Sequence, residues 1–151
     1  MWGRLATCGR LSIGLLATLI VTGFSQTPEP SRSFWDGVYT SGQAKRGQQL
    51  YHQQCASCHG EQLSGGEEAP ELAGGGFLAN WNGLTVGDLF ERIRVSMPQG
   101  RPGSLSRQHN ADILAYMLSV NQFPAGDTEL AAATEQLKQI RFEAAKPANN
   151  K

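Results

Sequence analysis

The chain has 151 residues, which is enough for one globular domain and little more. Its 13 lysine and arginine side chains balance 13 aspartate and glutamate side chains, so the formal net charge is zero. This balance excludes the strongly basic character that favours binding to polyanions, and we expect no nucleic-acid partner.

The first 25 residues are typical of a secretory signal peptide. Arg4 and Arg10 form a positive start, and the apolar run over residues 11–24 is too short to cross a bilayer comfortably. Small residues end the run, so we expect cleavage near Ser25, export to the periplasm and no stable membrane insertion afterwards. An uncleaved membrane anchor is the alternative.

Residues 26–37 are polar and contain two prolines, which predicts a flexible leader. The aromatic residues Phe34, Trp35 and Tyr39 are expected to pack on the body of the domain. The domain itself is expected over residues 38–122.

A first helix is predicted from Ser41, which can cap it, to about Gln54. Gly47 and Tyr51 lie four residues apart and therefore share a face. A glycine inside a helix costs about 1 kcal/mol relative to alanine. Close approach by another helix is one reason for a sequence to accept that cost.

The segment Cys55-Ala56-Ser57-Cys58-His59 follows this helix directly and has the C-x-x-C-H spacing of covalent c-type haem attachment. Each thiol can form a thioether with one haem vinyl group, and the adjacent imidazole is then an iron ligand. A zinc site would need further ligands, and the chain has no second C-x-x-C. A thioredoxin-like redox pair would need a βαβ context, which the flanking sequence lacks.

Glycines and a proline punctuate residues 60–76, so this segment is predicted to be a loop that wraps a flat cofactor. A second helix is predicted from Thr85 to near Ser96, because Thr85 and Asp88 form a capping-box pattern and Pro98 forces an exit. A third helix is predicted from Ser106 or Asn110 to about Val120.

The tail over residues 123–151 is predicted to be a C-terminal extension that packs on the domain and frays at its end. Its apolar residues Leu130, Leu137 and Ile140 indicate one more short amphipathic helix.

The second axial ligand of the iron decides between electron transfer and chemistry on a bound small molecule. Met117 falls on the apolar face of the third helix, and His52 lies on the helix that leads into the motif. His109 stands in polar sequence at a helix start. Met97, at a helix-to-proline exit, is the predicted ligand opposite His59.

Five features in order resemble a class I c-type cytochrome of the small bacterial monohaem type, over about Val38 to Asn121. They are the helix with Gly47 and Tyr51, the run Cys55 to Gly60, Pro70 with Leu72, Met97-Pro98, and Ala111 to Tyr116. The resemblance implies an all-α cytochrome c fold: three core helices and loops around one covalently bound haem c, here with a short extra C-terminal helix.

In that family the first and last core helices cross closely, which implies that Gly47 and Tyr51 lie against Ile113 and Tyr116. The resemblance also implies that the Pro70 carbonyl accepts a hydrogen bond from Nδ1 of His59 and so orients the imidazole.

Trp81 and Arg101 are candidates for holding the haem propionates, because an indole N–H or a guanidinium stabilises a partly buried carboxylate. A core aromatic residue and a solvated charge are the ordinary alternatives for these two side chains.

These observations predict a periplasmic electron carrier rather than an enzyme. The resemblance implies redox protein partners, with a periplasmic dehydrogenase as donor and an oxidase or another cytochrome as acceptor. Four arginines lie close to Met97 in the sequence and could steer an acidic partner, or they could be ordinary solvated charges: Arg92, Arg94, Arg101 and Arg107. The alternatives are a dedicated cytochrome subunit of a periplasmic dehydrogenase, or a haem enzyme or sensor with an open sixth site.

Overall fold

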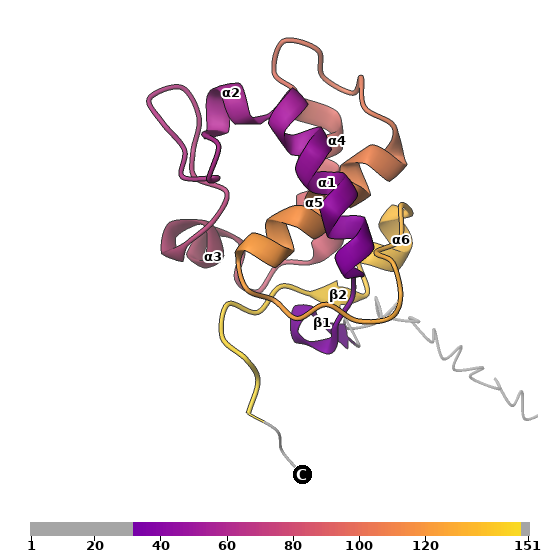
Figure 1. The fold of residues 1–151 in the computed structure, drawn as a ribbon. Coiled ribbons are helices and arrows are strands. Elements are labelled where there is room, and N and C mark those ends of the chain that lie inside the picture. The colour runs from indigo at the N-terminus through magenta and orange to yellow at the C-terminus, as the bar shows by residue number, and fades with distance from the viewer. Residues whose placement is uncertain (1–31, 149–151) are drawn as a thin grey trace, which may run out of the picture.

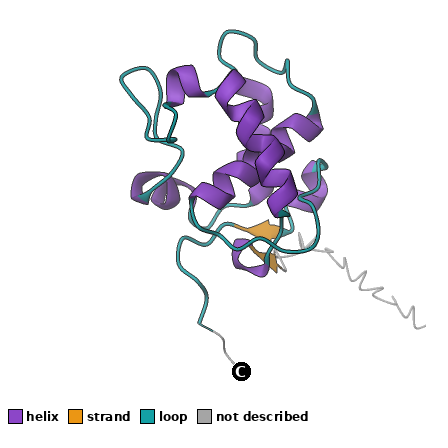
Figure 2. Cartoon of the chain, viewed as in Figure 1, coloured by secondary structure: helices purple, strands orange, loops and turns teal. Residues whose placement is uncertain are grey.

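The structure is a computed structural model that describes residues 32–148, and the predicted signal peptide lies outside this range. It is mainly helical, as expected, with one short strand pair (Figures 1 and 2). In chain order the elements are β1 (Arg32–Ser33), η1 (Phe34–Asp36), α1 (Ser41–Gln54), α2 (Ala56–His59), α3 (Gly75–Trp81), α4 (Val86–Ser96), α5 (Arg107–Val120), α6 (Thr134–Leu137) and β2 (Ile140–Arg141).

Helices α1 and α5 cross at the centre of the molecule (Figure 1). Gly47 is buried at the crossing, where a Cβ atom on it would come within 1.8 Å of the Asp112 carbonyl oxygen. One turn further along α1, the rings of Tyr51 and Tyr116 lie 5.4 Å apart. The contact implied for these residues is confirmed, and the mid-helix glycine is required by the close approach of two backbones.

Side-chain caps fix the starts of the three long helices. Ser106 accepts from the amide of His109 at the start of α5, and Thr85 forms the predicted capping box with Asp88 at the start of α4. The residue that caps helix α1 lies one position before the expected cap, Ser41. Thr40 is the cap and accepts from the amide of Gln43, so Ser41 is the first helical residue.

The loop predicted for residues 60–76 ends earlier than expected, because α3 begins at Gly75. Gly74, with a φ of 93°, turns the chain into this helix. Phe77 is buried and its ring lies 5.8 Å from that of Phe142, so this apolar side chain holds α3 against the core. Burial of this side chain outweighs the low helix propensity of the two starting glycines.

Residues 32–36 belong to the folded body, which corrects the expectation of a flexible leader up to residue 37. Strand β1 pairs in parallel with β2, and η1 follows with Phe34 fully buried. Phe34 contacts Phe123 and Phe142, with ring centroids 5.0 and 4.4 Å away, while the Trp35 indole donates to the Glu143 carbonyl at 2.9 Å. The expected packing of these aromatic residues is confirmed.

The extra amphipathic helix was predicted too long. Only Thr134–Leu137 is helical, and Ile140 lies in β2. Leu130 is held differently, by a pair of buried hydrogen bonds: the Gln43 side-chain amide donates to its carbonyl, and its own amide donates to Gln43 Oε1. Strand pairing and this amide clamp fix the extension where helical periodicity alone had suggested a longer helix.

Within residues 32–148, no helix is both long enough and apolar enough to cross a membrane.

Candidate haem site

The two cysteines of the motif lie where α1 ends and α2 begins. The amide of Cys55 still donates to the Tyr51 carbonyl at 2.8 Å, but its φ of −128° leaves helical geometry. The amides of Cys58 and His59 both donate to the Cys55 carbonyl, at 3.1 and 3.0 Å, so the chain turns again at once. Cys55 is half-buried, Cys58 is exposed, and both thiols are free. Both can therefore form thioethers.

Two other uses of this motif do not fit the structure. Burial, and secondarily the Cys58 thiol, raise the pKa of Cys55 to about 11, whereas a redox-active pair needs a thiol with a lowered pKa. The flanking elements are helices rather than a βαβ unit. Over residues 32–148, no group of three or more His, Cys, Asp or Glu side chains is arranged to hold a metal ion, which disfavours a zinc site.

His59 is held in one ring orientation. It is 8% exposed, and its Nδ1 lies 2.8 Å from the Pro70 carbonyl oxygen, the hydrogen bond that the resemblance implied. A carbonyl can only accept, so Nδ1 carries the proton and Nε2 keeps its lone pair. That is the tautomer a metal-bound imidazole needs.

The loop after His59 folds back so that Pro70 reaches the imidazole. The Gly65 amide donates to the His59 carbonyl at 2.9 Å, and the Leu72 amide donates to the Leu63 carbonyl at 2.8 Å. Gly65 has a φ of 71°, and a Cβ atom on it would lie 2.7 Å from the Pro70 carbonyl carbon. Gly65 is therefore a residue of the site that the sequence analysis did not single out.

Tyr51 connects the crossing of α1 and α5 to the same turn. Its hydroxyl donates to the Gly60 carbonyl at 2.7 Å, one residue beyond His59. Burial raises the pKa of Tyr51, so the hydroxyl stays protonated and keeps donating at physiological pH. The tyrosine thus braces the chain that carries the imidazole.

Met97 caps the C-terminal end of α4 and is half-buried. Met97 begins a segment, residues 97–105, that contacts the part of the molecule that carries the attachment motif. Arg101 Nη2 donates to Oε1 of Gln54, the residue before Cys55, at 3.1 Å. Figure 1 shows this segment reaching over the end of α1 that leads to α2. The structure therefore brings the segment that begins at Met97 to the attachment motif.

The competing ligands have other partners or places. Nδ1 of His52 lies 2.5 Å from a carboxylate oxygen of Glu61. Met117 lies on α5 and is 1% exposed in the hydrophobic core, as predicted for a packing residue. His109 is exposed in the first turn of α5. Met97 remains the predicted ligand.

The two propionate candidates lie on different elements. Trp81 ends α3 and is half-buried, and within residues 32–148 its indole N–H has no hydrogen-bond acceptor. Arg101 is exposed and already bonded to Gln54. Trp81 thus has a free donor for a carboxylate, and both residues stay predictions.

Apolar side chains on several elements pack on the core yet remain partly exposed. They are Cys55, Leu72, Leu78, Trp81, Ile93 and Leu105. Such surface suits a large flat apolar group that would cover it. The two free thiols and the oriented imidazole beside them are residues that fit covalent attachment of a haem.

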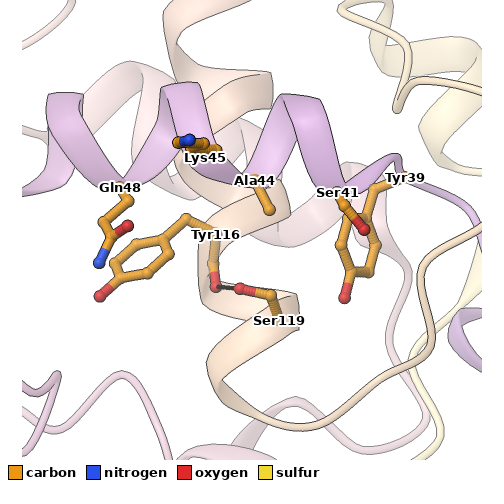
Figure 3. A pocket seen from close by; sticks show the side chains of 7 residues that line it. All are labelled: Tyr39, Ser41, Ala44, Lys45, Gln48, Tyr116 and Ser119. Carbon is orange, nitrogen blue, oxygen red and sulfur yellow. Dashed lines mark hydrogen bonds between the residues drawn. The ribbon is translucent and has the colours of Figure 1, made fainter.

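A separate surface pocket of about 260 Å³ lies between the start of α1 and the end of α5 (Figure 3). Tyr39, Lys45 and Tyr116 are among its lining residues, and Ser119 beside them donates to the Tyr116 carbonyl at 2.7 Å. None of the predicted haem residues lines it.

Comparison with known families agrees with this geometry. The model of the family described as cytochrome c oxidase, cbb3-type, subunit III matches residues 42–117, half of the chain. The chain belongs to this family of c-type cytochromes. Its domain therefore binds haem c covalently, and the matched range includes all of α1 after its first residue, the attachment motif, Met97 and most of α5.

Two individual proteins are also similar to this cytochrome. A thiosulfate dehydrogenase from Stutzerimonas stutzeri (strain A1501) is 31% identical over 107 residues, which are 64% of this chain and 31% of that protein. The chain thus spans about a third of the length of that curated relative. The crystal structure of the sulfane dehydrogenase SoxCD from Paracoccus pantotrophus is 22% identical, with a TM-score of 0.48, and the match covers 85% of this chain and 73% of that one.

Proposed function

We propose that this cytochrome carries single electrons between redox proteins in the periplasm, with His59 and Met97 as the axial ligands of its iron. The observation that carries the proposal is the 2.8 Å hydrogen bond from His59 Nδ1 to the Pro70 carbonyl. It fixes the imidazole in the tautomer and orientation of an iron ligand, directly beside two free thiols.

A bound haem c supplies one-electron chemistry, because its iron alternates between the ferrous and ferric states. Cys55 and Cys58 would anchor the group at two points, and His59 would bind the iron on the side of α2. Met97 would bind on the opposite side, where a soft thioether favours the reduced state. Two protein ligands leave no position for a substrate, which favours a carrier over an enzyme or sensor.

The relatives support a dehydrogenase as the electron donor. The similar chain of S. stutzeri is named for a dehydrogenase activity, and our chain matches about a third of it. A donor that oxidises an inorganic sulfur compound is therefore the first to test.

The C-terminal extension is not well suited to permanent attachment to such a donor. Its large apolar side chains, Leu130, Leu137, Ile140 and Phe142, are all buried within the chain. Because these side chains are buried inside the domain, they cannot form the apolar contact that a permanent subunit interface would need. We therefore favour transient docking.

The docking surface next to the attachment motif is acidic, which changes the expectation about the arginines. Arg94 and Arg107 both pair with Glu91, Arg101 is bonded to Gln54, and Arg92 is exposed. Four exposed carboxylates follow the exposed Cys58 in the loop before α3: Glu61, which pairs with His52, and Glu67, Glu68 and Glu71. We propose that the partner presents a basic surface there.

Absorption spectroscopy of the ferric protein tests the ligand assignment. The wild type should show the weak near-infrared band of methionine-ligated ferric haem, and Met97→Ala should abolish it. Met117→Leu is the matched control, since it replaces a buried methionine by a residue of similar volume and should keep the band. Loss of the band in Met117→Leu, or its survival in Met97→Ala, would show that the assignment is wrong.

A further inference from the structure

Asn110 is a buried polar residue whose hydrogen bonds are only partly satisfied. It lies in the first turn of α5 and is 1% exposed. Its Nδ2 donates to the carbonyls of Leu105 and Ser106, at 3.3 and 3.0 Å. Its Oδ1 is buried and has no hydrogen-bond donor among residues 32–148.

An unpartnered buried acceptor lowers stability, so a sequence that keeps one needs a reason. An apolar side chain at position 110 would extend the run of buried residues on α5 and leave no acceptor unpaired. An apolar side chain could not donate a hydrogen bond to the carbonyl of Leu105, which is the last residue before the helix cap Ser106. The useful part of Asn110 is therefore its amide nitrogen.

Leu105 closes the segment that begins at Met97. At its start, the Met97 amide donates to the Ile93 carbonyl at 2.9 Å and so makes the last hydrogen bond of α4. In its middle, Arg101 is bonded to Gln54 at the end of α1. At its end, the Asn110 amide binds Leu105. The segment is thus tied to three different helices.

We propose that Asn110 is a positioning residue for Met97: it holds the end of the 97–105 segment against α5 and so favours the arrangement in which the thioether binds the iron. This inference rests on the proposed function, because it requires Met97 to be the ligand. It predicts that removing the amide loosens the ligand segment while the fold keeps its stability. Departures from full hydrogen bonding are commonly kept at functional sites, where they cost some stability.

The affinity of the ferric protein for added imidazole measures how strongly the segment favours binding of Met97 to the iron, because imidazole competes with Met97 for that position. In Asn110→Leu and Asn110→Ala, imidazole should bind tighter by up to roughly tenfold, which corresponds to the loss of one net hydrogen bond, the one to the Leu105 carbonyl, from the ligand segment. Asn110→Leu should unfold at the wild-type temperature or above it, because it removes the unpaired acceptor. Asn110→Ala is the second variant, which tests the same prediction if a leucine side chain does not fit at position 110.

Gln43→Leu is the matched control. Gln43 is also a buried amide side chain with two hydrogen bonds, but it clamps Leu130 in the C-terminal extension. It should unfold at a lower temperature and bind imidazole as the wild type does.

Unchanged imidazole affinity in both Asn110 variants, or an equal gain in Gln43→Leu, would overturn the positioning role while leaving Met97 as the ligand. Absence of the methionine band in the wild-type spectrum would instead overturn the proposed ligation, and the positioning role with it.

Discussion

Gly47 of α1 lies directly against the backbone of Asp112 of α5, so that a single methyl group at position 47 would come within 1.8 Å of the Asp112 carbonyl oxygen. The backbone of α5 cannot move away easily, because Arg46 of α1 binds the Asp112 carboxylate and Tyr51 packs on Tyr116. The crossing therefore accepts only glycine at this position.

Gly47→Ala should lower the free energy of unfolding by about 3 kcal/mol, the upper end for an overpacked core. Gly42→Ala, in the same helix, is the control. Its Cβ atom would meet only the Thr40 hydroxyl at 3.9 Å, so this variant should gain about 0.5 kcal/mol from helix propensity. Chemical denaturation measures both. Equal effects of the two variants would contradict the close crossing.

Gly65→Ala should raise the reduction potential, by an amount on the order of tens of millivolts. The added methyl would press on the Pro70 carbonyl carbon at 2.7 Å and displace the acceptor of the His59 hydrogen bond. A weaker bond makes the imidazole less basic and stabilises ferric iron less. Redox titration followed by absorbance gives the potential.

Gly83→Ala is the control that separates the effect of backbone strain from the effect of the contact with the Pro70 carbonyl. Gly83 has a φ of 86°, similar to the 71° of Gly65, but nothing lies within 4 Å of its added Cβ atom. Its substitution should lower stability and leave the potential unchanged. A potential shift in Gly83→Ala as large as in Gly65→Ala would argue against the role of the Pro70 contact.

Glu91 should make stability depend on pH in the acidic range. Hydrogen bonds from Arg94, then from Thr134, lower the pKa of Glu91 from its ordinary 4.5 to about 2. Because the folded-state pKa is lowered, the contribution of Glu91 is complete above pH 4.5 and is lost as the pH falls towards 2. Its contacts join α4 to α5 and α6 through Arg107 and Thr134.

Glu91→Gln should therefore be less stable than the wild type at neutral pH, and the two should converge near pH 2 in urea unfolding. Glu135→Gln is the control, because Glu135 also faces a cation at i+3, Lys138, but is 85% exposed. It should follow the wild-type curve. A constant difference between Glu91→Gln and the wild type across this range would refute the linkage.

The acidic loop after Cys58 should govern reaction with small charged oxidants. The ferrous protein should react with cationic tris(phenanthroline)cobalt(III) at a rate that falls with added salt, and with anionic ferricyanide at a rate that rises. Glu67→Gln combined with Glu68→Gln should weaken both dependences. Asp127→Asn removes an exposed carboxylate of the C-terminal extension and should change neither. Salt dependences of the opposite sign would indicate a basic docking surface.

Much of the fold could be predicted because its signals are local. The caps Thr85 and Ser106 mark the starts of α4 and α5, and Pro98 marks the end of α4. The attachment motif carries its own chemistry in five residues. Met97 could be selected over Met117 because Met117 falls on an apolar helical face.

The features that were missed depend on contacts between distant parts of the chain. Helix α3 starts with glycines, and only the burial of Phe77 reveals it. Ile140 has helical spacing from Leu137 but pairs with Arg32 in a parallel strand. Gly65 and Asn110 resemble ordinary loop and helix residues until Pro70 and Leu105 lie beside them. No local pattern reports such neighbours.

The strand pair at the base of the molecule also sets an order of events during synthesis. It closes the fold through residues far apart in the chain: Trp35 and Glu143, joined by a hydrogen bond, are 108 positions apart. The two thiols come early, so a chain that emerges with its N-terminus first exposes them before the closing strand exists. Haem attachment at this stage would take place on an open chain that exposes Cys55 and Cys58, and pairing of the C-terminal strand would then close the domain around the group.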